Sequence, residues 1–136
     1  MNKKEIRKVI INEANNAFNF GKPDEFDFKV RAYNPVCGDK FELYFKFNGN
    51  IIESVHFSGI GCTVSKASSS ILLKEIIGFD RDTVLSIVAT FLEKFEKNEQ
   101  LIPASTLIFQ DKSKFNGREQ CIKLSWIALK EYLEKM

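Results

Sequence analysis

The chain is 136 residues long, 44% hydrophobic and 28% charged, which is the composition of a folded domain with a substantial core rather than of a disordered segment. Its 20 basic and 18 acidic residues leave a net charge of +2, so nothing in the charge favours nucleic acid or an anionic membrane as the main partner. No apolar run approaches the roughly 18 residues of a membrane span, and we expect a single domain over residues 1–136.

The amino-terminal segment predicts a helix followed by a strand. Apolar side chains recur near the 3.6-residue period of a helix over residues 2–19, and Gly21 and Pro23 end the pattern. The side chains on the predicted buried face are Ile6, Val9, Ile10, Ala14 and Ala17. Residues 27–33 alternate apolar with charged side chains, which predicts a strand with one solvated face and with Phe28 on its apolar face.

Two further strands joined by a tight turn follow the Pro/Gly-containing loop. Residues 41–47 alternate cleanly, and the Asn-Gly-Asn sequence at 48–50 is a strong hairpin signal. A strand over 51–57 completes a small three-stranded antiparallel sheet. Strict alternation places Phe57 on the buried face of this strand and Ile52 on the opposite face.

The second half of the chain is mostly helical. A helix is predicted to begin at Cys62 and to stop at Gly78, and its run of small residues would let another element approach closely. Asp80 or Asp82 caps a third helix that runs to about Lys97.

Residues 98–117 are polar and have no clear assignment, and a last helix is predicted over about 119–135. The fold class is therefore α+β, with a small three-stranded antiparallel sheet packed against about four to five helices.

The three cysteines are an odd number, a poor basis for a disulfide framework, which favours a reducing, cytoplasmic location with free thiols. Cys62 and Cys121 fall at predicted helix starts, where the helix dipole should lower the pKa of a thiol. Cys37 and Asp39 lie two residues apart in a loop and can aim at one point. Three thiolates and a carboxylate suit tetrahedral Zn²⁺, and the same ligands could hold an iron–sulfur cluster.

Such a ligand set carries four negative charges, two more than Zn²⁺ neutralises, and Arg118 and Lys40 stand beside ligands in the sequence. Simpler interpretations remain open. Each cysteine alone could be a small buried hydrophobe, Asp39 could cap a turn, and Arg118 could be a solvated charge. His56, the only histidine, is expected to be structural or exposed.

Two stretches of the sequence, NPVCGDKFELYFKFNGNIIESVHFSGIGCTVSKASSS and REQCIKLSWIALKEYL, resemble the SufU/IscU family, which includes the amino-terminal part of NifU. The resemblance implies that Cys37, Asp39, Cys62 and Cys121 are the metal or cluster ligands. It also implies a partner, a SufS-like pyridoxal-phosphate cysteine desulfurase that delivers sulfur as a persulfide.

Departures from the IscU pattern favour a SufU-like member. Gln120 stands where IscU-type chains have a histidine, the Leu-Pro-Pro-Val-Lys motif is absent, and 58 residues separate Cys62 from Cys121, more than in IscU-type chains. Arg118, three residues before Cys121, is similar to the SufU pattern. This implies zinc-dependent sulfur transfer, with Cys37 receiving the sulfur and Arg118 assisting docking or charge balance. Whether the chain is an enzyme in its own right stays open.

The alternative implied by the resemblance is a scaffold that builds a transient [2Fe–2S] cluster and donates it to apo iron–sulfur proteins or an assembly complex. A purely structural zinc domain ranks last, because an aspartate ligand and the loop-borne Cys37 make a site that can open.

Overall fold

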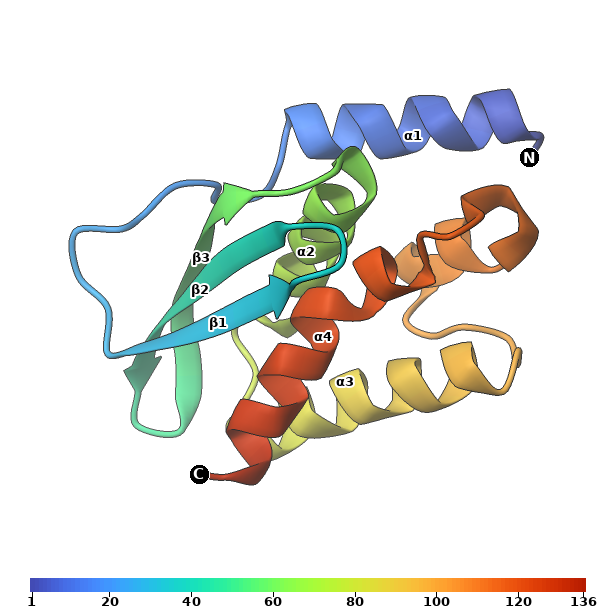
Figure 1. Cartoon of the computed structure of the whole chain (residues 1–136). Coiled ribbons are helices and arrows are strands. Elements are labelled where there is room, and N and C mark those ends of the chain that lie inside the picture. The colour runs from blue at the N-terminus through green and yellow to red at the C-terminus, as the bar shows by residue number, and fades with distance from the viewer.

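A computed structural model describes all 136 residues and shows a three-stranded sheet surrounded by helices (Figure 1). In chain order the elements are α1 (Lys3–Asn15), β1 (Phe28–Asn34), β2 (Asp39–Asn48), β3 (Ile51–Ile60), α2 (Thr63–Ile76), α3 (Arg81–Glu96), the 3₁₀-helices η1 (Ala104–Phe109) and η2 (Lys112–Phe115), and α4 (Glu119–Glu134). The strands pair antiparallel in the order β1-β2-β3. The predicted α+β class and the predicted sheet are confirmed.

The central strand β2 carries the apolar face of the sheet. Phe41, Leu43 and Phe45 alternate along it and are almost completely buried, as the sequence predicts. The pairing of β2 with β3 is irregular between Lys46 and Phe47. Because a bulge of this kind adds one residue to a strand, it reverses which face the next residues point to. Ile52 therefore lies in the core, fully buried, and its predicted position on the solvated face is wrong.

Two helix predictions at the amino terminus need correction. A capping box formed by Asn2 and Glu5 starts α1, but the helix ends at Asn15 rather than near residue 19. Its buried face is narrower than expected, because Val9 remains 41% exposed. Phe28 is also 41% exposed at the start of its strand, although the alternation placed it on the apolar face.

Helices α2 and α4 pack against each other through the small side chains that the sequence indicated. The Ser68 hydroxyl donates to the backbone carbonyl of Ile122 over 2.6 Å and accepts the indole N–H of Trp126 over 2.9 Å. At the neighbouring positions of the two helices, the hydroxyls of Ser69 and Ser125 are 2.6 Å apart. These buried bonds fix how far α2 is shifted along α4, and each of the two helices begins near the same end of the sheet.

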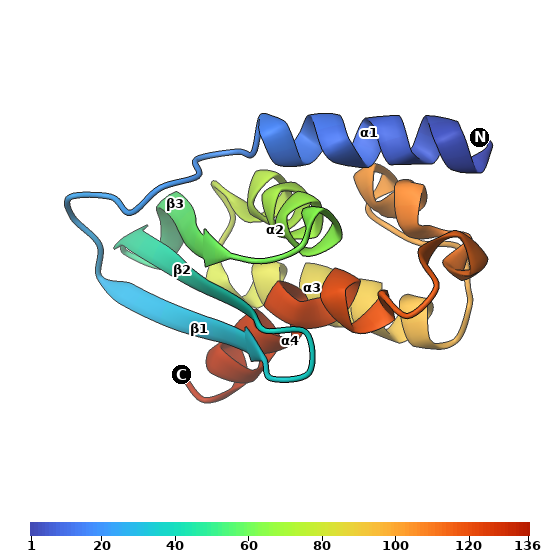
Figure 2. The same ribbon diagram turned by 45° about the horizontal axis from the view of Figure 1, so that its top comes forward.

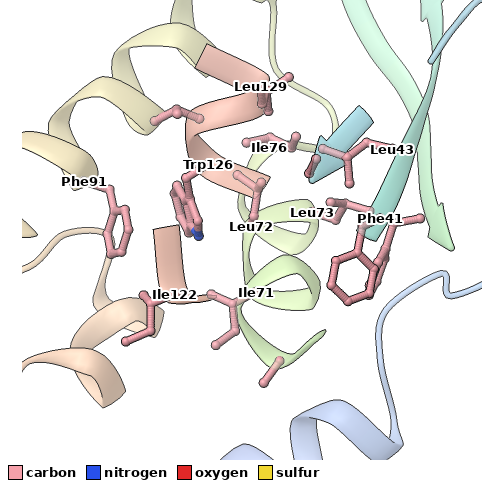
Figure 3. Close-up of a cluster of buried hydrophobic side chains, with 14 of the residues drawn as sticks. Phe41, Leu43, Ile71, Leu72, Leu73, Ile76, Phe91, Ile122, Trp126 and Leu129 are labelled. Carbon is pink, nitrogen blue, oxygen red and sulfur yellow. The ribbon is translucent and has the colours of Figure 1, made fainter. Parts of the chain in front are cut away.

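A cluster of large apolar side chains joins α3 to this helix pair (Figure 3). The fully buried Trp126 stacks on Phe91, with ring centroids 4.1 Å apart. The segment that the sequence left unassigned, residues 98–117, forms η1 and η2 and contributes the buried Phe109 and Phe115 to the core. No helix of the chain combines the length and the hydropathy needed to cross a membrane.

Candidate metal centre

The four predicted site residues come from three separate segments of the chain. Cys37 lies in the turn between β1 and β2, Asp39 is the first residue of β2, Cys62 is the N-cap residue of α2, and Cys121 lies in the first turn of α4. Figures 1 and 2 show the β1–β2 turn close to the starts of both helices. The antiparallel sheet and the paired helices thus bring these residues together at one end of the sheet.

Three of the four residues form one compact group of potential metal ligands. The Sγ atoms of Cys37 and Cys121 and a carboxylate oxygen of Asp39 all lie within 4.8 Å of one another. The two sulfurs are 3.9 Å apart. Tetrahedral Zn²⁺ with zinc–sulfur bonds of about 2.3 Å places its sulfur ligands about 3.8 Å from each other. The geometry of this group therefore fits a single tetrahedral ion.

Cys62 adjoins the group through Asp39 rather than sitting inside it. Its backbone N–H donates to Asp39 Oδ1 over 2.9 Å, and its Sγ is 3.9 Å from Oδ2 of the same carboxylate. The backbone N–H of Ser65 also donates to this sulfur over 3.4 Å. Asp39 consequently does two things at once: it connects β2 to the start of α2, and it places a carboxylate oxygen within 4.8 Å of the sulfurs of Cys37 and Cys121.

The thiols differ strongly in their access to solvent. Cys37 is exposed and Cys62 is half-buried, whereas Cys121 is 1% and Asp39 is 2% exposed. A protein partner can therefore reach Cys37 directly, while the two buried candidate ligands, Asp39 and Cys121, lie beneath the surface.

The pKa of the Cys121 thiol differs from the value that the sequence predicted. Burial, followed by the neighbouring Cys62 and Asp39, raises the pKa of the Cys121 thiol. The predicted lowering by the helix dipole is wrong for this residue, because loss of solvation and like-charge neighbours outweigh a dipole that acts from the first turn only. The positive charge comes from Arg118, whose own pKa is raised by the sulfur of Cys62 and then by that of Cys121. Lys40, also proposed from the sequence, is exposed and adds its charge beside Glu42 instead.

Two residues near the site, Ser65 and Gly61, were not among the predicted site residues. Ser65, fully buried, supports the Cys62 sulfur, and its only sequence signal is its place three residues after a helix cap. Gly61 has a steric role, because a Cβ atom there would lie 2.6 Å from the ring of Phe41. The glycine thus lets the chain pass over the core directly before Cys62. His56 is half-buried on β3, paired with Tyr44, and is not among the grouped ligand residues.

The fold and the site together define a class of small α+β proteins whose cysteine and aspartate side chains can hold a metal. The chain belongs to the NifU-like N terminal domain family, whose profile matches residues 5–131. The resemblance to SufU, IscU and NifU proteins of iron–sulfur cluster assembly is confirmed.

Individual relatives carry two different names. The chain is 34% identical over 132 residues to a zinc-dependent sulfurtransferase SufU of Bacillus subtilis, covering 95% of this chain and 89% of that protein. It is 30% identical over 132 residues to an iron–sulfur cluster assembly scaffold protein IscU of Thermotoga maritima, covering 95% and 92%. A solved structure from Fervidobacterium islandicum, described as an assembly scaffold protein for the SUF system, superposes with a TM-score of 0.83 at 26% identity and covers 93% and 94%.

Proposed function

We propose that this protein is a zinc-dependent sulfurtransferase that accepts persulfide sulfur from a cysteine desulfurase in the cytoplasm, for iron–sulfur cluster biogenesis. One observation carries the proposal: an exposed thiol, Cys37, lies 3.9 Å from the buried thiol of Cys121, with a carboxylate oxygen of Asp39 beside them. A partner can thus reach the thiol of Cys37, whereas the neighbouring side chains of Cys121 and Asp39 are buried.

The arrangement of these donors supports one metal ion rather than two. The ligand atoms of Cys37, Asp39 and Cys121 all fall within 4.8 Å of one another, as the corners of a single tetrahedron must. A dinuclear cluster divides its ligands between two irons, which spreads the ligand pairs farther apart. Cys62, whose Sγ is 3.9 Å from Asp39, is the proposed fourth ligand.

When bound, Zn²⁺ would hold these thiols as thiolates and so supply the nucleophile for sulfur transfer at neutral pH. The chain itself does the rest. The bond from the Cys62 N–H orients the carboxylate of Asp39, and Arg118 offsets part of the excess negative charge of the ligands. The β1–β2 turn presents Cys37 outward to the sulfur donor.

In the proposed transfer step, the thiolate of Cys37 attacks the outer sulfur of the persulfide on the desulfurase. A new sulfur–sulfur bond forms on Cys37, the sulfur–sulfur bond of the donor breaks, and the donor's cysteine leaves as a thiolate. No external oxidant or reductant is needed, because one sulfur–sulfur bond replaces another. The product is a persulfide on Cys37 that a later acceptor can collect.

The test is stimulation of desulfurase turnover by the Cys37→Ala variant. We expect complete loss of stimulation, and we expect mass spectrometry to detect a persulfide on the wild-type chain but none on this variant. Val36→Ala is the matched control, since Val36 is the neighbouring residue in the same turn, is 92% exposed and is not a ligand. Full stimulation by Cys37→Ala would exclude the proposed role.

The second candidate is a scaffold that assembles a transient [2Fe–2S] cluster and donates it to apo iron–sulfur proteins. The 30% identity to the Thermotoga maritima scaffold favours it. Metal analysis of the protein as purified, followed by anaerobic reconstitution, separates the two functions. Stoichiometric zinc that iron does not displace supports sulfur transfer. A stable visible spectrum with stoichiometric iron and sulfide, and transfer of the cluster to an acceptor, supports the scaffold.

A further inference from the structure

A groove of about 550 Å³ lies beside the candidate metal centre, between α1, the start of α2 and the segment that precedes α4. Four of its lining residues are charged, and all four are basic: Lys3, Arg7, Lys114 and Arg118. The whole chain, by contrast, has nearly equal numbers of basic and acidic residues, 20 and 18. The groove, named here the α1 groove, therefore concentrates positive charge on a protein that is almost neutral.

Most of this charge is not neutralised within the chain. Lys3, Arg7 and Arg118 are exposed and form no salt bridge. Lys114 pairs with Asp111 over 3.1 Å, and Asp111 does not line the groove. Lys3 and Arg7 thus face solvent with no anionic partner, whereas the charge of Arg118 is partly offset by the thiols of the candidate site. The excess positive charge favours an anionic occupant.

The shape and lining of the α1 groove indicate a peptide rather than a compact ion. Its lining on α1 extends from Lys3 to Ile11, which corresponds to roughly 12 Å of helix. That length matches about four residues of extended chain. Apolar side chains also line the groove, among them the exposed Ile11 and the half-buried Val64. A small anion would use the charges but not this apolar surface.

The position of the groove identifies which partner would use it. Its lining includes both Cys62 of the candidate site and Arg118, which precedes α4 and lies three residues before Cys121. We infer that an acidic, partly apolar segment of the cysteine desulfurase docks in the α1 groove while its persulfide meets Cys37; this inference rests on the proposed function. Docking at one side of the site leaves the exposed thiol free for the reaction.

A second groove of about 490 Å³, between β1 and α4, provides the comparison. It is lined by Lys29, Arg31 and Lys135 but also by Glu131, and Lys29 is paired with Glu42 over 3.0 Å. Its charge is mixed, so it offers no comparable attraction to an acidic segment. Arg31 and Lys135 form no salt bridge and can be reversed without breaking one.

The test is the double reversal Lys3→Glu and Arg7→Glu, measured as direct binding to a SufS-type desulfurase and as the concentration that gives half-maximal stimulation. Both side chains are exposed on α1, and acidic residues near a helix start are favourable, so the fold and the bound zinc should be retained. We expect the half-saturating concentration to rise about tenfold at low ionic strength, and the salt dependence of binding to weaken. The control Arg31→Glu with Lys135→Glu makes the same change in net charge and should bind like the wild type.

Two outcomes separate this inference from the proposed function. If the wild-type chain binds the desulfurase and the Lys3/Arg7 reversal stays within about twofold of it, the docking site is wrong and sulfur transfer is unaffected. A small anion as the occupant would give this same result. If the reversal weakens binding but Cys37→Ala still stimulates fully, the docking site stands and the sulfur-transfer role of Cys37 fails.

Discussion

The hydrogen bonds of Ser68 predict a measurable link between core packing and the site. Its hydroxyl accepts the N–H of the fully buried Trp126 and donates to the carbonyl of Ile122, across the contact of α2 with α4. Ser68→Ala leaves the indole N–H without a partner, which costs about 1–3 kcal/mol. The gain in helix propensity returns up to about 0.5 kcal/mol. We expect a net loss near 2 kcal/mol, or about 6–10 °C in Tm for a chain of this size.

The assay is denaturant unfolding followed by tryptophan fluorescence, because Trp126 is the only tryptophan in the chain. The signal then reports on the residue that loses its partner, and the emission of the folded state should also shift. Ser86→Ala is the matched control, because it is the same substitution at an exposed position of α3. That variant should be as stable as the wild type, or more stable by up to about 0.5 kcal/mol.

Equal stability of Ser68→Ala and Ser86→Ala, with unchanged emission, would refute the reasoning. It would mean that the Trp126 N–H bond contributes nothing and that apolar packing alone fixes the helices. The site provides a second readout. Because α2 and α4 carry Cys62 and Cys121 at their starts, a slip between the helices should also weaken zinc binding.

Three other predictions concern the metal, the turn before α2 and the start of α3. Burial raises the pKa of Cys121, so zinc must displace the proton of this thiol when it binds. Zinc affinity should therefore increase with pH, by about tenfold per pH unit for each proton displaced. Chelator competition at several pH values measures this dependence, and a flat profile would contradict it. Gly61→Ala places a Cβ atom 2.6 Å from the ring of the buried Phe41. We expect the free energy of unfolding to fall by about 1–3 kcal/mol, measured by thermal unfolding, and the zinc content to fall as well. Wild-type values for both would contradict the steric role of Gly61. Hydrogen bonds from Thr83 lower the pKa of Asp80 below its ordinary 3.8. The cap therefore stabilises α3 fully above about pH 4, and this stabilisation is lost as the pH falls through the lowered pKa. Asp80→Asn should flatten the loss of stability at acid pH, and an unchanged pH profile would show that the cap is not responsible.

The sequence predicted a helix, strand or turn well wherever residues close together in the chain decide its structure. The hairpin at 48–50 and the last helix over about 119–135 follow from neighbouring residues, and the structure has them. Of the two caps that the sequence offered for the third helix, Asp80 and Asp82, the structure uses Asp80. Ile52 was misplaced because strict alternation assumes a regular ladder, whereas a bulge depends on how two strands pair. The segment 98–117 showed no periodicity because its short 3₁₀-helices are stabilised by individual buried side chains such as Phe109.

The amino-acid sequence was enough to propose the candidate site residues, three cysteines, an aspartate and Arg118, all of which lie within the part of the chain that the family profile matches. Tertiary structure decided what each of them can do. Only packing shows that Cys37 is exposed while Cys121 is sealed beneath it, and that burial raises rather than lowers the pKa of Cys121. It also gathers Lys3, Arg7 and Arg118 around one groove from opposite ends of the chain. The physical reason is that solvation and charge depend on distances between residues that are far apart in sequence, and folding alone sets those distances.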